Sequence, residues 1–291
     1  MVTSENPLPD PSNDPQPLNS EPQIPVPSID PLPPPVLLPP LPAKSDENPV
    51  WSGWDVLQIA GLTLLTLFLA QLLVVLVALH FVFRHESWLE VAQKPSLALL
   101  SELLTYVAVA LYMILLIEGK YHTRFGQAIR WNWPGIAGVS FLGVGVLMLA
   151  FDLLGRLLPM PKSTPFDQFF SHPSDAYLTA IFAITLGPLM EELFFRGFLY
   201  PVLARRIGIF WAIVLTALPF GLIHMMQYGY AWGAVLIIFM VGVVLTAVRA
   251  ITKSVAASFL AHVGYNATLM VLAAIATDGF RHLDKAGFFL F

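Results

Sequence analysis

Seven apolar segments follow one another along most of this chain, and they constrain its fold more than any other feature. The first three exceed the about 20 helical residues that a bilayer core requires, whereas residues 209–225 are marginal and residues 233–248 are short. Only 12% of the residues are charged, so the chain falls outside the class of soluble domains, which carry roughly 25%. The segments cover residues 56–83, 97–117, 135–158, 176–207, 209–225, 233–248 and 255–276. We therefore predict an all-α, polytopic transmembrane bundle of about seven to eight helices.

The first 49 residues differ sharply from the rest in composition. They contain 16 of the 25 prolines and seven of the 19 acidic residues. Such a segment cannot bury enough apolar surface to offset its ordering entropy, which predicts a disordered, proline-rich tail with polyproline II character. A tether and a protein-interaction segment are both consistent with this composition. Trp51 and Trp54 follow, and we predict that they form an interfacial aromatic belt before the first span.

The N-terminus does not resemble a cleavable signal peptide, because no basic region precedes an apolar run that starts only near Val56. We predict an uncleaved signal anchor in an integral, multi-pass protein of the cell inner membrane. The lipid bilayer is thus the expected partner. A nucleic-acid partner is not expected, since the chain has no strongly basic face. The chain has no cysteine, which excludes disulfides, thiolate catalysis and cysteine-ligated metal. The sequence does not indicate the oligomeric state. It also does not strongly favour either orientation of the chain in the membrane.

Two carboxylates and a guanidinium lie together in the fourth apolar segment, where each ionisable group costs about 2.5–3.5 kcal/mol at membrane depth. On a helix Glu192 and Arg196 share a face and can pair, whereas Glu191 points about 100° away. Pairing between Glu192 and Arg196 leaves the negative charge of Glu191 uncompensated. Glu191 is therefore either protonated or turned toward water, a histidine or a metal. Each option makes Glu191 a candidate general base or ligand; the structural alternative is that all three residues lock two helices together.

Two histidines lie in later apolar segments, each with a partner four residues away. Phe220 precedes His224, and Asn266 follows His262, so each pair shares a helix face. Taken singly, such histidines are more often satisfied structural residues. Together with Glu191, however, three segments supply a carboxylate, two imidazoles and an amide. These groups can activate water and stabilise an oxyanion.

Two prolines predict where the helical hydrogen bonding is interrupted. Pro188 and Pro219 lie shortly before the acidic pair and before His224, and each removes a helix hydrogen bond. Freed carbonyls at membrane depth are tolerated only beside protein or a wet cavity, so we predict a water-accessible pocket. A proton-coupled transporter would also use buried Glu and His, but transporters usually contain internal repeats and none is visible.

Three motifs, in this order and spacing, resemble the CAAX protease and bacteriocin-processing family, the relatives of the Ras-converting CAAX endopeptidase that are often called Abi proteins in bacteria. They are Glu-Glu-x-x-x-Arg at 191–196, Phe-x-x-x-His at 220–224 and His-x-x-x-Asn at 262–266. The resemblance implies an intramembrane endopeptidase acting on a membrane-associated peptide or protein substrate, prenylated and CAAX-type in the Ras-converting relatives. A catalytically silent membrane scaffold or a bacteriocin-immunity protein of the same fold is the alternative. The expected division is a tail at 1–50, N-terminal transmembrane helices at 51–175, a catalytic transmembrane region at 176–276 and a C-terminal tail at 277–291.

The resemblance also implies roles for the motif residues. Glu191 would deprotonate the attacking water, with His224 helping to position it. His262 and Asn266 would polarise the scissile carbonyl and hold the oxyanion. The supporting ion pair would be formed by Glu192 and Arg196.

The resemblance leaves the cofactor open. The family is commonly labelled as metalloproteases, and Glu191, His224 and His262 could offer three ligands to zinc with a fourth position open. The chain has no His-Glu-x-x-His helix. A metal-free glutamate mechanism, also proposed in this family, fits the same residues, and we favour it slightly.

Overall fold

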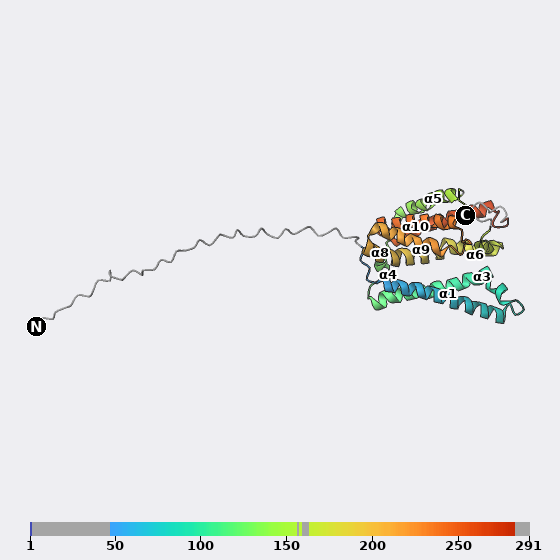
Figure 1. The fold of residues 1–291 in the computed structure, drawn as a ribbon, viewed down its shortest axis with the longest axis horizontal. Coiled ribbons are helices and arrows are strands. Elements are labelled where there is room, and N and C mark those ends of the chain that lie inside the picture. Colours follow the sequence, from blue (N-terminus) through green and yellow to red (C-terminus); the bar gives the residue numbers. More distant parts are fainter. Residues whose placement is uncertain (2–46, 156, 159–162, 283–291) are drawn as a thin grey trace, which may run out of the picture. The chain divides into compact units, whose positions relative to one another are not determined.

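The computed structural model describes residues 1, 47–155, 157–158 and 163–282, and within these ranges every regular element is a helix, which confirms the predicted all-α bundle (Figure 1). The predicted tail at 2–46 and residues 283–291 lie outside the described residues. The elements are α1 (Gly53–Phe81), α2 (Trp88–Ala92), α3 (Pro95–Leu115), η1 (Leu116–Lys120), α4 (Phe125–Ala128), η2 (Gly135–Ala137), α5 (Gly138–Gly155), η3 (Pro165–Phe170), α6 (Pro173–Ile184), α7 (Leu186–Glu191), η4 (Glu192–Leu199), α8 (Tyr200–Ile207), α9 (Ile209–Ile223), α10 (Trp232–Thr252) and α11 (Val255–Ala276).

Six stretches of the described chain are long and apolar enough to cross a membrane, so this is an integral, multi-pass membrane protein. They are Gly53–Phe81, Pro95–Lys120, Gly135–Gly155, Pro173–Ile207, Trp232–Thr252 and Val255–Ala276. The segment predicted as short, 233–248, is in fact the 21-residue helix α10. Its helix continues past the predicted end because Arg249 is buried in the protein and does not mark a membrane surface.

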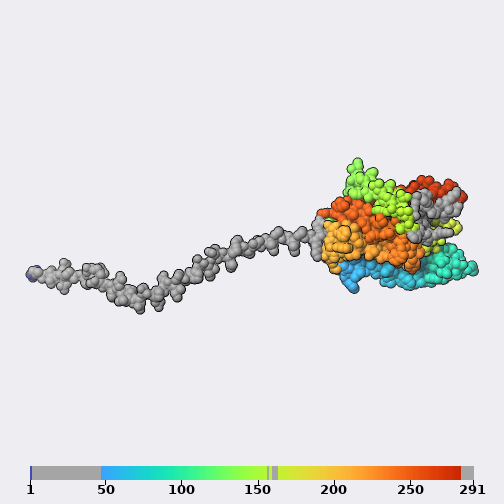
Figure 2. All heavy atoms as spheres, turned by 45° about the horizontal axis from the view of Figure 1, so that its top comes forward, coloured from blue at the N-terminus to red at the C-terminus, as the bar shows by residue number. Residues whose placement is uncertain are grey.

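The helices are arranged with α1 and α3 side by side along one edge of the bundle and α5 along the opposite edge (Figure 2). Helix α9 has only 15 residues, or about 22 Å at 1.5 Å per residue, which is less than the about 30 Å of a bilayer core. After this short helix the chain turns over residues 224–231, where Met226 and Tyr230 are exposed. The Phe166 amide donates to the Gln227 carbonyl at 3.2 Å, which ties this turn to η3.

The contact between α5 and α11 depends on two glycines. A Cβ atom on Gly145 would lie 2.2 Å from the Ala261 carbonyl oxygen, and one on Gly264 would lie 2.4 Å from the Leu142 carbonyl oxygen. Real Cβ atoms do not approach backbone so closely, so only glycine permits this spacing. The two helices thus form a tightly fixed pair.

The chain just before α1 packs against the bundle. Glu47 is 5% exposed, and its carboxylate accepts hydrogen bonds from Arg130 Nη1 at 2.9 Å and from Arg249 Nη1 at 2.8 Å. Residues from Glu47 onward therefore lie with the helices, although the sequence predicted a tail up to residue 50.

The two tryptophans predicted to form an aromatic belt differ in exposure. Trp54 is 67% exposed on the outer face of α1, as expected for a membrane-facing residue. Trp51 is 1% exposed, and its indole Nε1 donates to the Phe198 carbonyl at 3.0 Å. Because the indole N–H finds a backbone acceptor at the end of η4, Trp51 becomes a core residue.

Candidate active site

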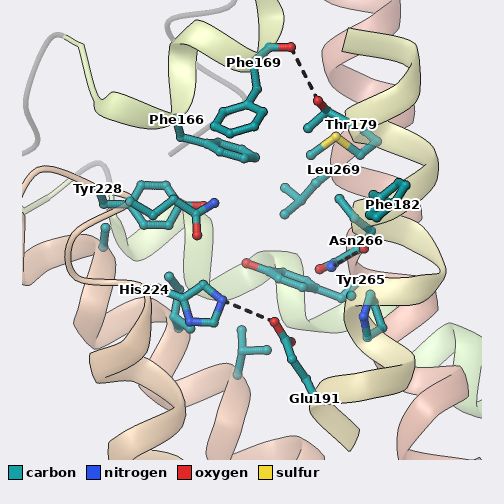
Figure 3. Close-up of a pocket in the computed structure, with 18 of the residues that line it drawn as sticks. Phe166, Phe169, Thr179, Phe182, Glu191, His224, Tyr228, Tyr265, Asn266 and Leu269 are labelled. Atoms are coloured by element: carbon teal, nitrogen blue, oxygen red, sulfur yellow. Dashed lines mark hydrogen bonds and ion pairs between the residues drawn. The ribbon is translucent and has the colours of Figure 1, made fainter. Parts of the chain in front are cut away.

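A cavity of about 510 Å³ lies between α3, α5, α6, α7, α10 and α11, beneath η3 and the turn after α9 (Figure 3). Apolar side chains make most of its wall, and Pro188 is among them. Its polar lining includes four of the six candidate residues from the sequence. The polar residues most relevant here are Glu102, Tyr106, Asp152, Glu191, His224, Tyr228, His262, Tyr265 and Asn266.

Glu191 lies between two imidazole rings. Its Oε1 is 3.6 Å from Nε2 of His224, and its Oε2 is 3.6 Å from Nε2 of His262. The Glu191 side chain remains 23% exposed, at the last residue of α7. Figure 3 shows its carboxylate and the His224 ring directed toward one another. Three groups from three helices therefore share one part of the cavity.

The His224 ring is held by its own helix end. Its Nδ1 lies 2.8 Å from the Phe220 carbonyl oxygen, which can only accept, so Nδ1 carries the proton. This bond satisfies a carbonyl in the last turn of α9, where His224 is the C-cap residue. The Phe220 ring packs edge-on against the imidazole, with centroids 5.3 Å apart. Nε2 is thereby left to face Glu191.

The His262 ring is oriented by the second carboxylate. Its Nδ1 donates to Glu192 Oε1 at 2.9 Å, and its Nε2 faces Glu191. The side chain is only 4% exposed. A carboxylate that holds the far nitrogen of a histidine fixes both the ring orientation and the tautomer. Glu192 therefore positions His262 and does not itself line the cavity.

The Glu192–Arg196 pair is fully buried and saturated with hydrogen bonds. Arg196 Nη1 donates to Glu192 Oε1 at 2.9 Å, and the Ser258 hydroxyl donates to Oε2 at 2.6 Å. The other guanidinium nitrogens reach the Gly242 carbonyl at 3.0 Å and the Thr246 hydroxyl at 3.2 Å. A buried charge pair is tolerated when its remaining donors and acceptors are satisfied in this way. The two residues link η4 with α10 and α11 behind Glu191 and the two histidines.

The helix that carries this pair is distorted. Residues Glu192–Leu199 form the π-helix η4, a conformation found frequently at functional sites. The Arg196 guanidinium lies 4.3 Å from the centre of the Phe220 ring, which also contacts His262 at 5.8 Å between centroids. A Cβ on Gly242 would lie 2.8 Å from this ring, so Gly242 leaves the room that Phe220 needs.

Asn266 lies one turn after His262 and lines the same cavity. Its Nδ2 donates to the Ala183 carbonyl at 2.7 Å, near the break between α6 and α7. An amide nitrogen carries two hydrogens, so one of them is not used in this bond. The expected hydrogen-bond donor is thus held at the cavity wall.

The cavity is also lined by polar residues that were not among the candidates from the sequence. Tyr265 donates to Asp152 Oδ1 at 3.0 Å, and the Tyr106 hydroxyl donates to Glu102. Burial raises the pKa of Tyr228, which keeps its hydroxyl protonated in the turn after α9. A sequence signal existed for both acids: each is a lone carboxylate inside an apolar segment, which marks a functional site by default.

The zinc ligands considered from the sequence do meet at the cavity. However, no group of three His, Cys, Asp or Glu side chains between Glu47 and His282, the masked gaps excepted, is arranged to hold a metal ion. Zinc requires contacts of about 2.0–2.2 Å from nitrogen and oxygen ligands. Here each Nε2 faces a different oxygen of Glu191 at 3.6 Å.

Comparison with known families found one match in the C-terminal region. Residues 173–268 match the family model described as Rce1-like, type II CAAX prenyl endopeptidase Rce1-like. This stretch contains all three motifs and overlaps the region, 176–276, expected from the resemblance. Comparisons with curated proteins and with solved structures gave no match. The C-terminal region of this chain is thus similar to the Rce1-like CAAX prenyl endopeptidase family.

Proposed function

We propose that this protein is an intramembrane endopeptidase in which the Glu191 carboxylate activates the water that attacks a peptide bond. The observation that carries the proposal is the position of Glu191, partly exposed in the cavity and 3.6 Å from an Nε2 atom on each side. A general base must reach its proton within hydrogen-bond distance or through one water, and this spacing leaves room for such a contact.

The reaction steps follow from these positions. The water donates one proton to Glu191 while its oxygen attacks the carbonyl carbon, and His224 Nε2 accepts its other hydrogen. The carbonyl becomes an oxyanion, which the amide of Asn266 and a protonated His262 Nε2 would stabilise. When the C–N bond breaks, Glu191 returns the proton to the leaving nitrogen. The products are a carboxyl group and an amine, with one water consumed.

Glu192 and Arg196 support the reaction by fixing the position of a neighbouring group. Glu192 accepts from His262 Nδ1 and so fixes the orientation of the ring, also when both ring nitrogens are protonated, and Arg196 holds Glu192 in place. Such positioning keeps the reacting groups within about 0.5 Å of the productive arrangement, as a preorganised site requires. We assign both as positioning residues.

We favour the metal-free form of this mechanism. If zinc were bound, Glu191, His224 and His262 would be its ligands, and the metal would polarise the carbonyl and acidify the water. Metal analysis of the purified protein, with a chelator added to a cleavage assay, separates the two forms. The metal-free form predicts unchanged turnover with chelator; stoichiometric zinc together with loss of turnover would contradict it.

The substrate class follows from the family. We propose a membrane-associated peptide or protein, with the prenylated CAAX sequence as the first candidate, since the matching family model carries that description. The cell inner membrane stays the expected location.

Peptide cleavage by the full chain in lipid nanodiscs tests the proposal. Glu191→Gln should lower kcat/KM by about 10²–10⁴-fold, the usual contribution of a general base. Glu86→Gln is the control, because Glu86 pairs with Lys94 outside the cavity. Equal cleavage by wild type and Glu191→Gln would refute the role of Glu191. If the wild-type protein cleaved none of the tested peptides, this result would support the silent-scaffold alternative.

A further inference from the structure

Residues 47–52, directly before α1, lie against the bundle, and the proposed reaction gives them no role. Glu47, Pro49 and Trp51 are buried, whereas the residues between them are exposed. This period of two is that of an extended segment with one face on the protein. The backbone of that face is also bonded, because the Pro49 carbonyl accepts from Arg205 Nη1 at 3.0 Å. We call residues 47–52 the N-terminal strap.

The two ends of the strap contact two different elements of the bundle. The Glu47 carboxylate accepts from Arg249 Nη1 at 2.8 Å, in the last turn of α10. The Trp51 indole donates to the Phe198 carbonyl of η4 at 3.0 Å, and the two rings lie 4.9 Å apart between centroids. The strap therefore joins α10 and η4 at the end of the bundle where α1 begins (Figure 1).

The same two elements, η4 and α10, hold Arg196. Gly242, Thr246 and Arg249 follow one another at intervals of four and three residues, so they lie on one face of α10. The first two accept hydrogen bonds from Arg196, and the third donates to Glu47. One face of α10 thus carries both the partners of Arg196 and the contact of the strap.

Trp51 contacts the end of the π-helix. Such helices are rare, so the register of η4, Glu192–Leu199, requires support from the surrounding protein. Pro201 follows in the first turn of α8 and has no amide hydrogen, which leaves this part of the helix with one donor fewer. The Trp51 indole brings a donor to the Phe198 carbonyl at this point. Its hydrogen bond therefore supports the end of η4.

We propose that Trp51 is a positioning residue of the active site and acts through η4. By supporting the register of this helix, it keeps in place the Glu192 carboxylate, which accepts from His262 Nδ1 at 2.9 Å. Glu47 fixes the other end of the strap. The inference rests on the proposed function, because the position of His262 affects turnover only if the site cleaves peptides. Since these groups are needed in the transition state, their displacement should lower kcat and leave KM unchanged.

Peptide cleavage by full-length Trp51→Phe protein in nanodiscs tests this role, because Phe keeps an aromatic ring and lacks the N–H donor. The kcat should fall by about fivefold, the factor that corresponds to the net free energy of one hydrogen bond, with KM unchanged. Hydrogen exchange followed by mass spectrometry is the second readout. The amides of residues 192–199 should exchange about fivefold faster, whereas those of α11 should keep the wild-type rate.

The matched control is Trp54→Phe, because Trp54 lies three residues further along the chain and is 67% exposed. It should keep the wild-type kcat and exchange rates. A wild-type kcat in Trp51→Phe would overturn the positioning role, and so would an equal loss in Trp54→Phe or a change in KM alone. Faster exchange in both η4 and α11 would indicate a general loss of stability and would also overturn it.

Failure of the proposed function gives a different result. The wild-type protein would then cleave none of the peptides, while the faster exchange of residues 192–199 in Trp51→Phe would still be observed. Wild-type exchange of these amides in Trp51→Phe would instead show that the strap does not support η4.

Discussion

Replacing Arg196 by Ala tests the buried network behind Glu191 and the two histidines. The guanidinium is fully buried, makes three hydrogen bonds and lies over the Phe220 ring. Its removal leaves the buried Glu192 carboxylate without its counter-charge, whereas the Gly242 carbonyl keeps the hydrogen bond from the Thr246 hydroxyl at 2.7 Å. Breaking a buried ion pair from one side costs about 3–5 kcal/mol. At about 2–4 °C per kcal/mol for a chain of this size, the melting temperature should fall by roughly 6–20 °C.

Thermal unfolding of purified variants in detergent measures this effect. Arg281→Ala is the matched control, since its guanidinium is 69% exposed and lies 3.9 Å from Asp278, so its melting temperature should hardly change. The double variant Arg196→Ala, Glu192→Gln should recover much of the lost stability, because Gln leaves no stranded charge. Its amide oxygen can still accept from His262, while its amide nitrogen can donate to the Ser258 hydroxyl oxygen. If Arg196→Ala melted like the control, or the double variant melted lower than Arg196→Ala, the stranded-charge reasoning would be wrong.

Two further substitutions test packing elsewhere in the bundle. Gly145→Ala should destabilise the fold by at least about 1–3 kcal/mol, because its Cβ would lie 2.2 Å from a backbone oxygen of α11. Gly143→Ala in the same helix is the control: its Cβ meets no atom within 4 Å, so this variant should be neutral or stabilising. Melting curves that rank these two variants the other way would contradict the close approach of α5 and α11. Glu47→Ala should cost about 3–5 kcal/mol, because it removes the carboxylate that contacts the buried Arg249. Unchanged unfolding of Glu47→Ala would show that the chain before α1 does not stabilise the bundle.

Helix periodicity explains which parts of the site could be predicted from sequence. The four-residue spacing correctly predicted that Glu192 pairs with Arg196 and that Glu191 turns to a different face, because both statements concern one helix. The neighbours Phe220 and His224 follow the same rule. Apolar length likewise predicted the membrane bundle. The catalytic roles of these residues stay predictions that the assays above address.

Contacts between distant segments could not be predicted in this way. His262 and Ser258 share the Glu192 carboxylate across a sequence separation that no periodicity encodes. For the same reason Trp51 looked like a membrane-surface residue, since its acceptor, the Phe198 carbonyl, lies far along the chain. The end predicted for the sixth apolar segment, residue 248, was wrong because the charge of Arg249 is neutralised by the carboxylate of Glu47, which precedes the first helix.

Cysteine accessibility tests most directly whether the proposed catalytic groups share one hydrated cavity. The natural chain contains no cysteine, so a single introduced thiol is the only site for a water-soluble methanethiosulfonate reagent. Glu191 and His224 are 23% and 17% exposed, whereas the neighbouring Glu192 is fully buried. Glu191→Cys and His224→Cys in nanodiscs should therefore be labelled many times faster than Glu192→Cys. Inert thiols at 191 and 224, or equally fast labelling at 192, would contradict the shared cavity.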